Sequence, residues 1–182
     1  MFGNNSKEAE LYYLYMMADG EVTHDEEKIF DVICKDELKI DNDEKKSIIR
    51  KCKKLADGTT DIFTVLMNER IEEQVGQGCF GNASSLARII WNLVNLGYAD
   101  SFYSDEEKKI VSYLVDKWSV SPEVHQELVD TADTILALTK QKAWITSTFD
   151  KSQIRDKKVK DVNSKIKGLL DSVKLTIEEL SI

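Results

Sequence analysis

The chain has 182 residues, 32% of them charged, with one proline and eight glycines. This length suits one domain with an appendage, and the scarcity of proline and glycine excludes a turn-rich β architecture, so we expect an all-α fold. The net charge of −8 and the pI near 4.9 argue against nucleic acid as a partner, because that affinity depends on lysine and arginine.

The cysteines and the hydropathy of the chain indicate where the protein works. Cys34, Cys52 and Cys79 cannot all pair, which is typical of reduced thiols in the cytoplasm. No run approaches the roughly 20 apolar residues that a membrane span requires, and the N-terminus lacks the pattern of a signal peptide. We therefore expect a cytoplasmic protein without a membrane span. Cys34 and Cys52 are predicted in the core, and Cys79 is predicted to be exposed.

The first predicted element is an aromatic, apolar helix that runs from Leu11 to the sequence Ala-Asp-Gly at residues 18–20. Leu11, Leu14 and Tyr15 share one face and are predicted to pack in the core. Tyr12 and Met16 share an edge of the same helix. Because tyrosine and methionine are adaptable contact residues, we predict that these two form a contact patch.

A second copy of this opening stretch lies at residues 98–115, displaced by 81 positions. The apolar faces of the helices that follow also match at helical spacing. We therefore predict two copies of a unit in which three helices are joined by two corners. The matched corner residues are Asp19 with Asp100, Thr23 with Ser104, and Glu26 with Glu107.

Both corners carry the pattern of a capping box. In this motif the hydroxyl of the cap residue accepts from the amide three residues later, and the glutamate there accepts from the amide of the cap residue. Thr23 with Glu26 and Ser104 with Glu107 have this spacing. A helix is therefore predicted to begin directly after Thr23 and another after Ser104.

Between the two copies, residues 61–75 have the pattern of one amphipathic helix, and residues 76–81 read Gly-Gln-Gly-Cys-Phe-Gly. The spacing is that of a dinucleotide-binding G-x-G-x-x-G, with Asp100 about twenty residues further on. A helix precedes these glycines where the motif needs a strand. We therefore interpret them as the end of one helix leading to Asn82, a predicted cap of the next, and keep phosphate chemistry as a distant alternative.

The last part of the chain is predicted to form long helices. From Pro122 the chain can stay helical past Trp144, and we expect residues 1–149 to form one helical domain and residues 150–182 a C-terminal amphipathic helical tail. The tail either packs on its own domain or pairs with a partner, including a second copy of the chain as a homodimer. Its recurring apolar residues are Val159, Val162, Ile166, Leu169, Val173 and Leu180.

The corner sequence Ala-Asp-Gly-Glu-Val-Thr-x-x-Glu at residues 18–26, repeated as Ala-Asp-Ser-Phe-Tyr-Ser-x-x-Glu at residues 99–107, resembles the TerB-like family of tellurite-resistance and stress-response proteins. That family includes the N-terminal domain of a membrane-anchored DnaJ-type co-chaperone. The resemblance covers residues 6–145, and the second corner departs from the family pattern at Ser101 and Phe102.

The resemblance implies a non-enzymatic, all-helical stress-response domain that engages protein partners. It also implies that the two corners lie close together and can hold a divalent cation such as calcium or magnesium. Carried over by position, the candidate metal ligands are Asp19, Glu26, Asp100 and Glu107.

Two interpretations of these acidic corners stay open. Calcium prefers about six to eight oxygen ligands, more than one corner offers, whereas two corners together supply four carboxylates whose repulsion a cation relieves. Alternatively, the glutamates are only helix caps, and the protein is a structural interaction module whose tail helix recruits a partner. An EF-hand is excluded, because positions six and twelve of a loop starting at Asp19 are His24 and Phe30.

The sequence offers no constellation for nucleophilic catalysis. It contains no Gly-x-Ser-x-Gly elbow and no Walker loop. Its two histidines, His24 and His125, are predicted at the surface near helix starts, and they are too few for a typical zinc hydrolase. We therefore expect a protein that is not an enzyme.

Overall fold

The computed structural model describes residues 3–59, 61–79, 82–150 and 153–180. Within this part of the chain all regular structure is helical and no strand occurs, so the predicted all-α class is confirmed. The elements are α1 (Gly3–Met16), α2 (His24–Val32), the π-helix η1 (Ile33–Glu37), α3 (Asn42–Leu55), α4 (Ile62–Glu69), α5 (Ile71–Gly78), α6 (Ala83–Gly97), α7 (Asp105–Lys117), α8 (Pro122–Thr148) and α9 (Gln153–Glu179).

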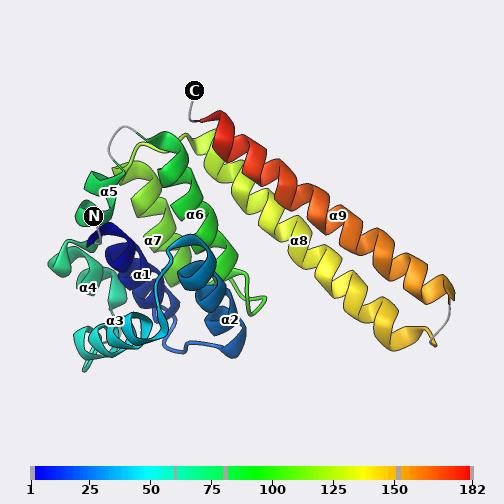
Figure 1. Ribbon diagram of the computed structural model, residues 1–182, viewed down its shortest axis with the longest axis horizontal. Coiled ribbons are helices and arrows are strands. Elements are labelled where there is room, and N and C mark those ends of the chain that lie inside the picture. Colours follow the sequence, from blue (N-terminus) through cyan, green and yellow to red (C-terminus); the bar gives the residue numbers. More distant parts are fainter. Residues whose placement is uncertain (1–2, 60, 80–81, 151–152, 181–182) are drawn as a thin grey trace.

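Helix α1 lies at the centre of the domain, where α2 to α7 surround it (Figure 1). Every residue from Glu8 to Met16 is buried, as expected for a helix that neighbours cover on all sides. The predicted contact patch of Tyr12 and Met16 is therefore wrong, because both side chains lie inside the core.

The buried acidic residues of α1 form ion pairs with the helices around it. Arg88 of α6 places Nη1 2.7 Å from Oε1 of Glu8, and Lys51 of α3 places Nζ 2.7 Å from Oε1 of Glu10. Tyr12 also donates a hydrogen bond of 2.7 Å to Glu8. A buried carboxylate without such partners would be strongly destabilising, so these contacts let a charged central helix be buried.

The predicted helix at residues 61–75 is interrupted at Arg70. This residue has a left-handed backbone, with φ of 52° and ψ of 35°, which ends α4 and starts α5 in a new direction. The prediction of one helix is therefore wrong, because no glycine or proline in the sequence marked the break. Helix α5 continues to Gly78, further than predicted.

Of the glycines after residue 75, Gly76 allows close packing against Trp118 and Gly78 is the last residue of α5. A Cβ atom at Gly76 would lie 2.7 Å from Nε1 of Trp118, so this position holds α5 against the end of α7. Cys79 is buried, which corrects the prediction that it is exposed. The last two residues of the predicted loop, 80 and 81, lie outside the described residues. Asn82 caps α6 as predicted, its side chain accepting from the amide of Ser85 at 3.0 Å.

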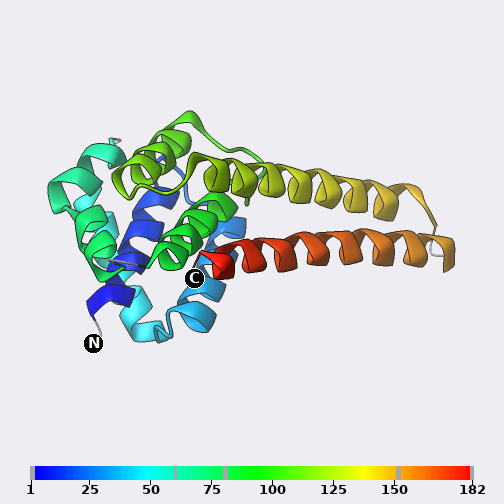
Figure 2. The ribbon, with the colours of Figure 1, turned by 90° about the horizontal axis from the view of Figure 1, so that it is seen from above.

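Helices α8 and α9 form an antiparallel hairpin that extends away from the domain, and the end of α9 returns to pack near α6 (Figures 1 and 2). Each has 27 residues, which corresponds to about 40 Å. The predicted domain boundary falls at the turn between them. The tail helix thus packs on its own chain, and its predicted apolar face is turned inward: Val162 and Val173 are buried, and Val159, Ile166, Leu169 and Leu180 are half-buried.

Two further predictions concern the whole chain. The order α1, α2, α3 with a corner after α1 is followed later by α6, α7, α8 with a corner after α6; the duplication of a three-helix unit itself stays a prediction. Across the described residues, no helix combines the length and the apolar character that crossing a membrane would require.

Candidate cation site at the two acidic corners

The first corner joins α1 to α2 and contains the predicted capping box. The backbone N and Oγ1 of Thr23 both donate to Oε2 of Glu26, at 2.7 and 2.8 Å. The amide of Glu26 donates in return to Oγ1 of Thr23, at 3.3 Å. Glu26 is only 3% exposed, so the hydrogen bonds of the cap hold a carboxylate inside the protein.

The second corner joins α6 to α7 and repeats this arrangement. The backbone N and Oγ of Ser104 donate to Oε2 of Glu107, at 2.8 and 2.9 Å, and the amide of Glu107 donates to Oγ of Ser104 at 3.1 Å. Glu107 is also 3% exposed. Both predicted capping boxes are therefore confirmed.

The aspartate of each corner stabilises the turn that precedes the cap. Oδ1 of Asp19 accepts from the amide of Glu21 at 3.2 Å, and Oδ1 of Asp100 accepts from the amide of Phe102 at 2.8 Å. A side chain that accepts from the amide two residues on is the usual Asx-turn. One oxygen of each aspartate is used in this way, and the other makes no hydrogen bond with the described residues.

The departures from the family pattern at Ser101 and Phe102 do not change the shape of the second corner. Gly20 has φ of 96° and Ser101 has φ of 72°, so both follow their aspartate in the left-handed region. The Phe102 side chain is exposed and leaves the turn itself undisturbed. The second corner thus keeps the conformation of the first with a serine in the place of glycine.

The two corners lie close enough for the carboxylates of one to influence those of the other. Burial raises the pKa of Glu26, and the negative charges of Asp19 and Asp100 raise it further. Burial raises the pKa of Glu107 to about 7, with further contributions from Asp19 and Glu26. Each glutamate therefore lies within electrostatic range of the aspartate of the opposite corner.

A buried hydroxyl lies behind the two glutamates. Tyr15 is fully buried, and its Oη makes no hydrogen bond of good geometry with the described residues, although the Tyr103 hydroxyl is near enough to affect its pKa. Burial raises the pKa of this phenol, and the charges of Glu107 and Glu26 add to the effect, so the hydroxyl lies near both corners. A Cβ atom at Gly97 would be 2.5 Å from this Oη. The sequence placed Tyr15 in the core but gave no sign of this position, because α6 and α7 are distant along the chain.

The donor chemistry of the corners fits a hard cation, although the carboxylates do not form a complete ligand shell. Calcium and magnesium take carboxylate, carbonyl, hydroxyl and water oxygens, which is the donor set of both corners. In each capping box Oε1 of the glutamate makes no hydrogen bond with the described residues. Within that part of the chain, no three His, Cys, Asp or Glu side chains are grouped so that they could hold a metal ion.

The two histidines differ in their surroundings. His24, at the start of α2, is exposed as predicted. His125, in the first turn of α8, is half-buried, and burial lowers its pKa. The prediction of a surface histidine is therefore only partly right for His125.

Comparison with known proteins identifies the part of the chain that holds the corners. A family model described as "Tellurite resistance protein TerB" matches residues 8–130, which is more than half of the chain. The match runs from α1 into α8 and includes both corners; α9 and the outer part of α8 lie beyond it. No curated protein and no solved structure matches the chain.

Proposed function

Because the chain belongs to the TerB family, we propose that it is a non-enzymatic cytoplasmic stress-response domain whose paired corners bind a divalent cation, calcium or magnesium. The ligands in this proposal are Asp19, Glu26, Asp100 and Glu107. By joining the turn after α1 to the turn after α6, the bound ion fixes the angle between helix pairs. The domain then presents a defined surface to protein partners.

The observation that carries the proposal is the electrostatic effect of one corner on the other. Burial raises the pKa of Glu107 in the second corner to about 7, and Asp19 and Glu26 of the first corner contribute in the same direction. Asp100 of the second corner raises the pKa of Glu26 in the first. Carboxylates crowded in this way repel one another, and a divalent cation removes the repulsion.

The free oxygens of the corners supply the ligands. In the glutamates Oε2 is held by the capping box, so Oε1 is available, and in the aspartates the oxygen outside the Asx-turn is available. The cation supplies positive charge between carboxylates that are otherwise mutually repulsive. The Tyr15 hydroxyl, buried near both glutamates and the Tyr103 hydroxyl, is a further oxygen that can contact the cation or its bound water.

Isothermal titration calorimetry of chelator-treated protein tests the proposal. Calcium and magnesium should each be titrated into the wild type, into Asp19→Asn/Asp100→Asn, and into Asp25→Asn/Asp105→Asn. The last variant is a matched control, since Asp25 and Asp105 are exposed aspartates in the first turns of α2 and α7. Both double variants remove two negative charges.

The proposal expects binding heat in the wild type and in the control, and its loss in Asp19→Asn/Asp100→Asn. Equal heat in all three proteins would show that any cation binds elsewhere. Heat that falls equally in both double variants would indicate a diffuse response to net charge instead of a site.

The second candidate is an interaction module in which the corners serve only as helix caps. The observation that favours it is that, in the described part of the chain, no three possible ligand side chains are grouped for a metal ion, while both glutamates already work in capping boxes. In this case the partner-binding element is α9, which exposes Leu170 and Leu175, and the partner can be a second copy. Sedimentation equilibrium of the full chain and of Leu170→Ser/Leu175→Ser tests the homodimer: a wild-type monomer at high micromolar concentration would refute it.

A further inference from the structure

The outer end of the α8–α9 hairpin combines positive charge with exposed apolar side chains. We call residues 140–150 and 153–160 the hairpin tip. They carry six basic and two acidic side chains, a net charge of +4, in a chain whose net charge is −8. The basic residues are Lys140, Lys142, Arg155, Lys157, Lys158 and Lys160.

The apolar side chains of the hairpin tip gather where α8 ends and α9 begins. Trp144 is 58% exposed and Ile154 is 66% exposed. The ring of Phe149 lies edge-on to Trp144, with 5.7 Å between centroids, and Nζ of Lys158 lies 5.7 Å from the Phe149 centroid. This is an exposed aromatic and aliphatic patch bordered by lysines.

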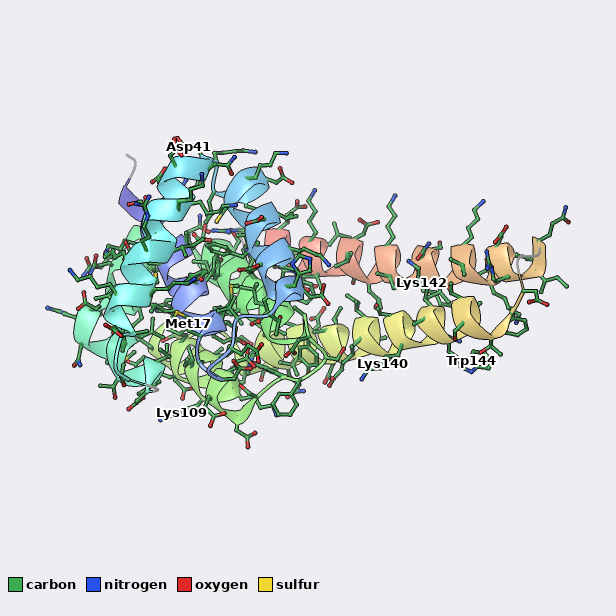
Figure 3. The ribbon with its side chains drawn as sticks, turned by 90° about the horizontal axis from the view of Figure 1, so that it is seen from below. Met17, Asp41, Lys109, Lys140, Lys142 and Trp144 are labelled. Carbon is green, nitrogen blue, oxygen red and sulfur yellow. The ribbon has the colours of Figure 1, made fainter. Side chains whose placement is uncertain are left out.

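The charges of the tip are kept apart from the acidic domain. The hairpin places its turn at the far end of two helices of about 40 Å, and Figure 3 shows Lys140, Lys142 and Trp144 on the half of α8 that extends beyond the domain. At physiological ionic strength, charges more than about 8 Å apart in solvent are largely screened from each other. The tip can therefore approach an anionic surface without repulsion from the domain.

We propose that the hairpin tip docks on an anionic lipid bilayer, with Trp144 and Ile154 entering the interfacial region and the basic side chains facing the lipid headgroups. Tryptophan is favoured at the boundary between headgroups and acyl chains, and lysines reach phosphate groups while their stems cover apolar surface. Stable peripheral binding needs two signals, an apolar insertion and a basic patch, and the tip supplies both.

The composition of the tip favours lipid over the other anionic surfaces. A nucleic-acid phosphate backbone is held by basic side chains alone, and an exposed Ile154 at the end of a hairpin adds nothing to such contacts. A second copy of the chain, with its net charge of −8, would attract the basic side chains, and self-association is therefore a separate outcome of the test. A bilayer takes up both the charge and the apolar side chains.

Vesicle flotation with the full chain tests this proposal. Vesicles of phosphatidylcholine with one third phosphatidylserine should be compared with pure phosphatidylcholine, in EDTA, so that no cation links the acidic corners to lipid. The tip variants are Trp144→Ser/Ile154→Ser and Lys157→Glu/Lys160→Glu. The matched control is Lys46→Glu/Lys54→Glu, which makes the same charge change on exposed lysines of α3.

We expect the wild type to bind the anionic vesicles and not the neutral ones. Each tip variant should weaken binding by about tenfold or more. Trp144→Ser/Ile154→Ser removes the apolar side chains that insert, and Lys157→Glu/Lys160→Glu removes basic side chains that each add to the affinity for an anionic surface. The control should bind as the wild type does. The fluorescence of the wild type should shift to shorter wavelength on anionic vesicles, and Trp144→Phe should remove the shift, because Trp91 and Trp118 lie in the domain.

Several outcomes would overturn the proposal. These are no binding to anionic vesicles, equal binding by the tip variants and the control, or binding that is the same on neutral vesicles. Circular dichroism of each variant shows whether its helices are intact, so that lost binding is not due to unfolding. Tip-dependent binding to a DNA duplex without vesicle binding would assign the tip to nucleic acid, and tip-dependent self-association would assign it to a second copy.

Discussion

The two acidic corners have the same hydrogen bonds but different surroundings. Glu26 and Glu107 each accept from the backbone and the hydroxyl of a cap residue three positions earlier. The residue before the cap is Val22 in the first corner and Tyr103 in the second. Burial raises the pKa of both glutamates, and it brings that of Glu107 to about 7. Local sequence thus sets the hydrogen bonds of a corner, whereas its tertiary neighbours set its charge state.

The difference lies in the aromatic packing behind the second corner. The rings of Tyr98 and Tyr103 pack at a tilt of 44° with centroids 4.9 Å apart, and Gly97 leaves space for both Tyr15 and Tyr103. Aromatic side chains displace water from the neighbourhood of Glu107, which disfavours its ionised form. The first corner has the smaller Val22 in the place of Tyr103.

The largest predicted effect comes from filling that space. In Gly97→Ala, the new Cβ atom would lie 2.5 Å from Oη of Tyr15 and 2.7 Å from Cδ2 of Tyr103, so the rings have to move. Because overpacking of a close-packed core is costly, we expect a loss of about 2 to 3 kcal/mol in the free energy of unfolding, measured by urea denaturation.

The matched control for this prediction is Gly168→Ala in α9. A Cβ atom there meets nothing within 4 Å, so the substitution changes helix propensity alone. We expect it to raise stability by about 0.5 to 1 kcal/mol. A loss of stability in Gly97→Ala no larger than about 0.5 kcal/mol would show that the packing behind the second corner is loose. Close aromatic packing would then not explain how the surroundings of the two corners differ.

A second prediction concerns the pH dependence of stability in metal-free protein. The folded-state pKa of Glu107 is raised, so the folded chain holds its proton more tightly than the unfolded chain does. The stabilisation is fully present below the ordinary glutamate pKa and is lost as the pH rises through about 7. After allowance for screening we expect a fall of about 2 kcal/mol over this window.

Glu107→Gln should remove this pH dependence. The amide oxygen can still accept the hydrogen bonds from Ser104, so the cap is retained while the titration is lost. Glu106→Gln is the control, because its side chain is exposed in the same turn. Denaturation between pH 4.5 and pH 8 should show a flatter profile for Glu107→Gln alone. A wild-type profile that rises with pH would contradict the raised pKa.

The parts of the fold that depend on neighbouring residues could be predicted from the sequence. A capping box is contained within four residues, so Thr23 with Glu26 and Ser104 with Glu107 identified two helix starts. The apolar spacing of the tail was likewise sufficient to predict which residues of α9 face inward. These features need no knowledge of where other helices lie.

Features set by distant parts of the chain could not be predicted. A single amphipathic face on the first helix predicts Tyr12 and Met16 at its edge, whereas α1 is covered by other helices on every side. The break between α4 and α5 occurs at Arg70, which has a left-handed backbone. Glycine is the residue that usually marks such a conformation, so an arginine gives no indication of it in the sequence. The position of Tyr15 between two corners also depends on packing alone.

The smallest predicted effect concerns the residue after the aspartate, which is glycine in the first corner and serine in the second. Ser101 adopts φ of 72°, where Gly20 at the matched position adopts φ of 96° without strain. A side chain in the left-handed region costs about 1 kcal/mol, and part of the gain from removing it is offset by the greater freedom of glycine in the unfolded chain. Ser101→Gly should therefore raise the free energy of unfolding by about 0.5 kcal/mol, and Gly20→Ala should lower it by about 1 kcal/mol.

Ser101→Ala separates backbone strain from the serine hydroxyl. It keeps a Cβ atom in the left-handed conformation, so its stability should stay within about 0.3 kcal/mol of the wild type. Urea denaturation of the three variants at one pH measures all the differences. If Ser101→Ala gained as much stability as Ser101→Gly, the hydroxyl and not the backbone would be the source of the cost. If Gly20→Ala left the free energy of unfolding unchanged, the left-handed position of the first corner would not require glycine. The two turns would then tolerate a side chain at this position equally well.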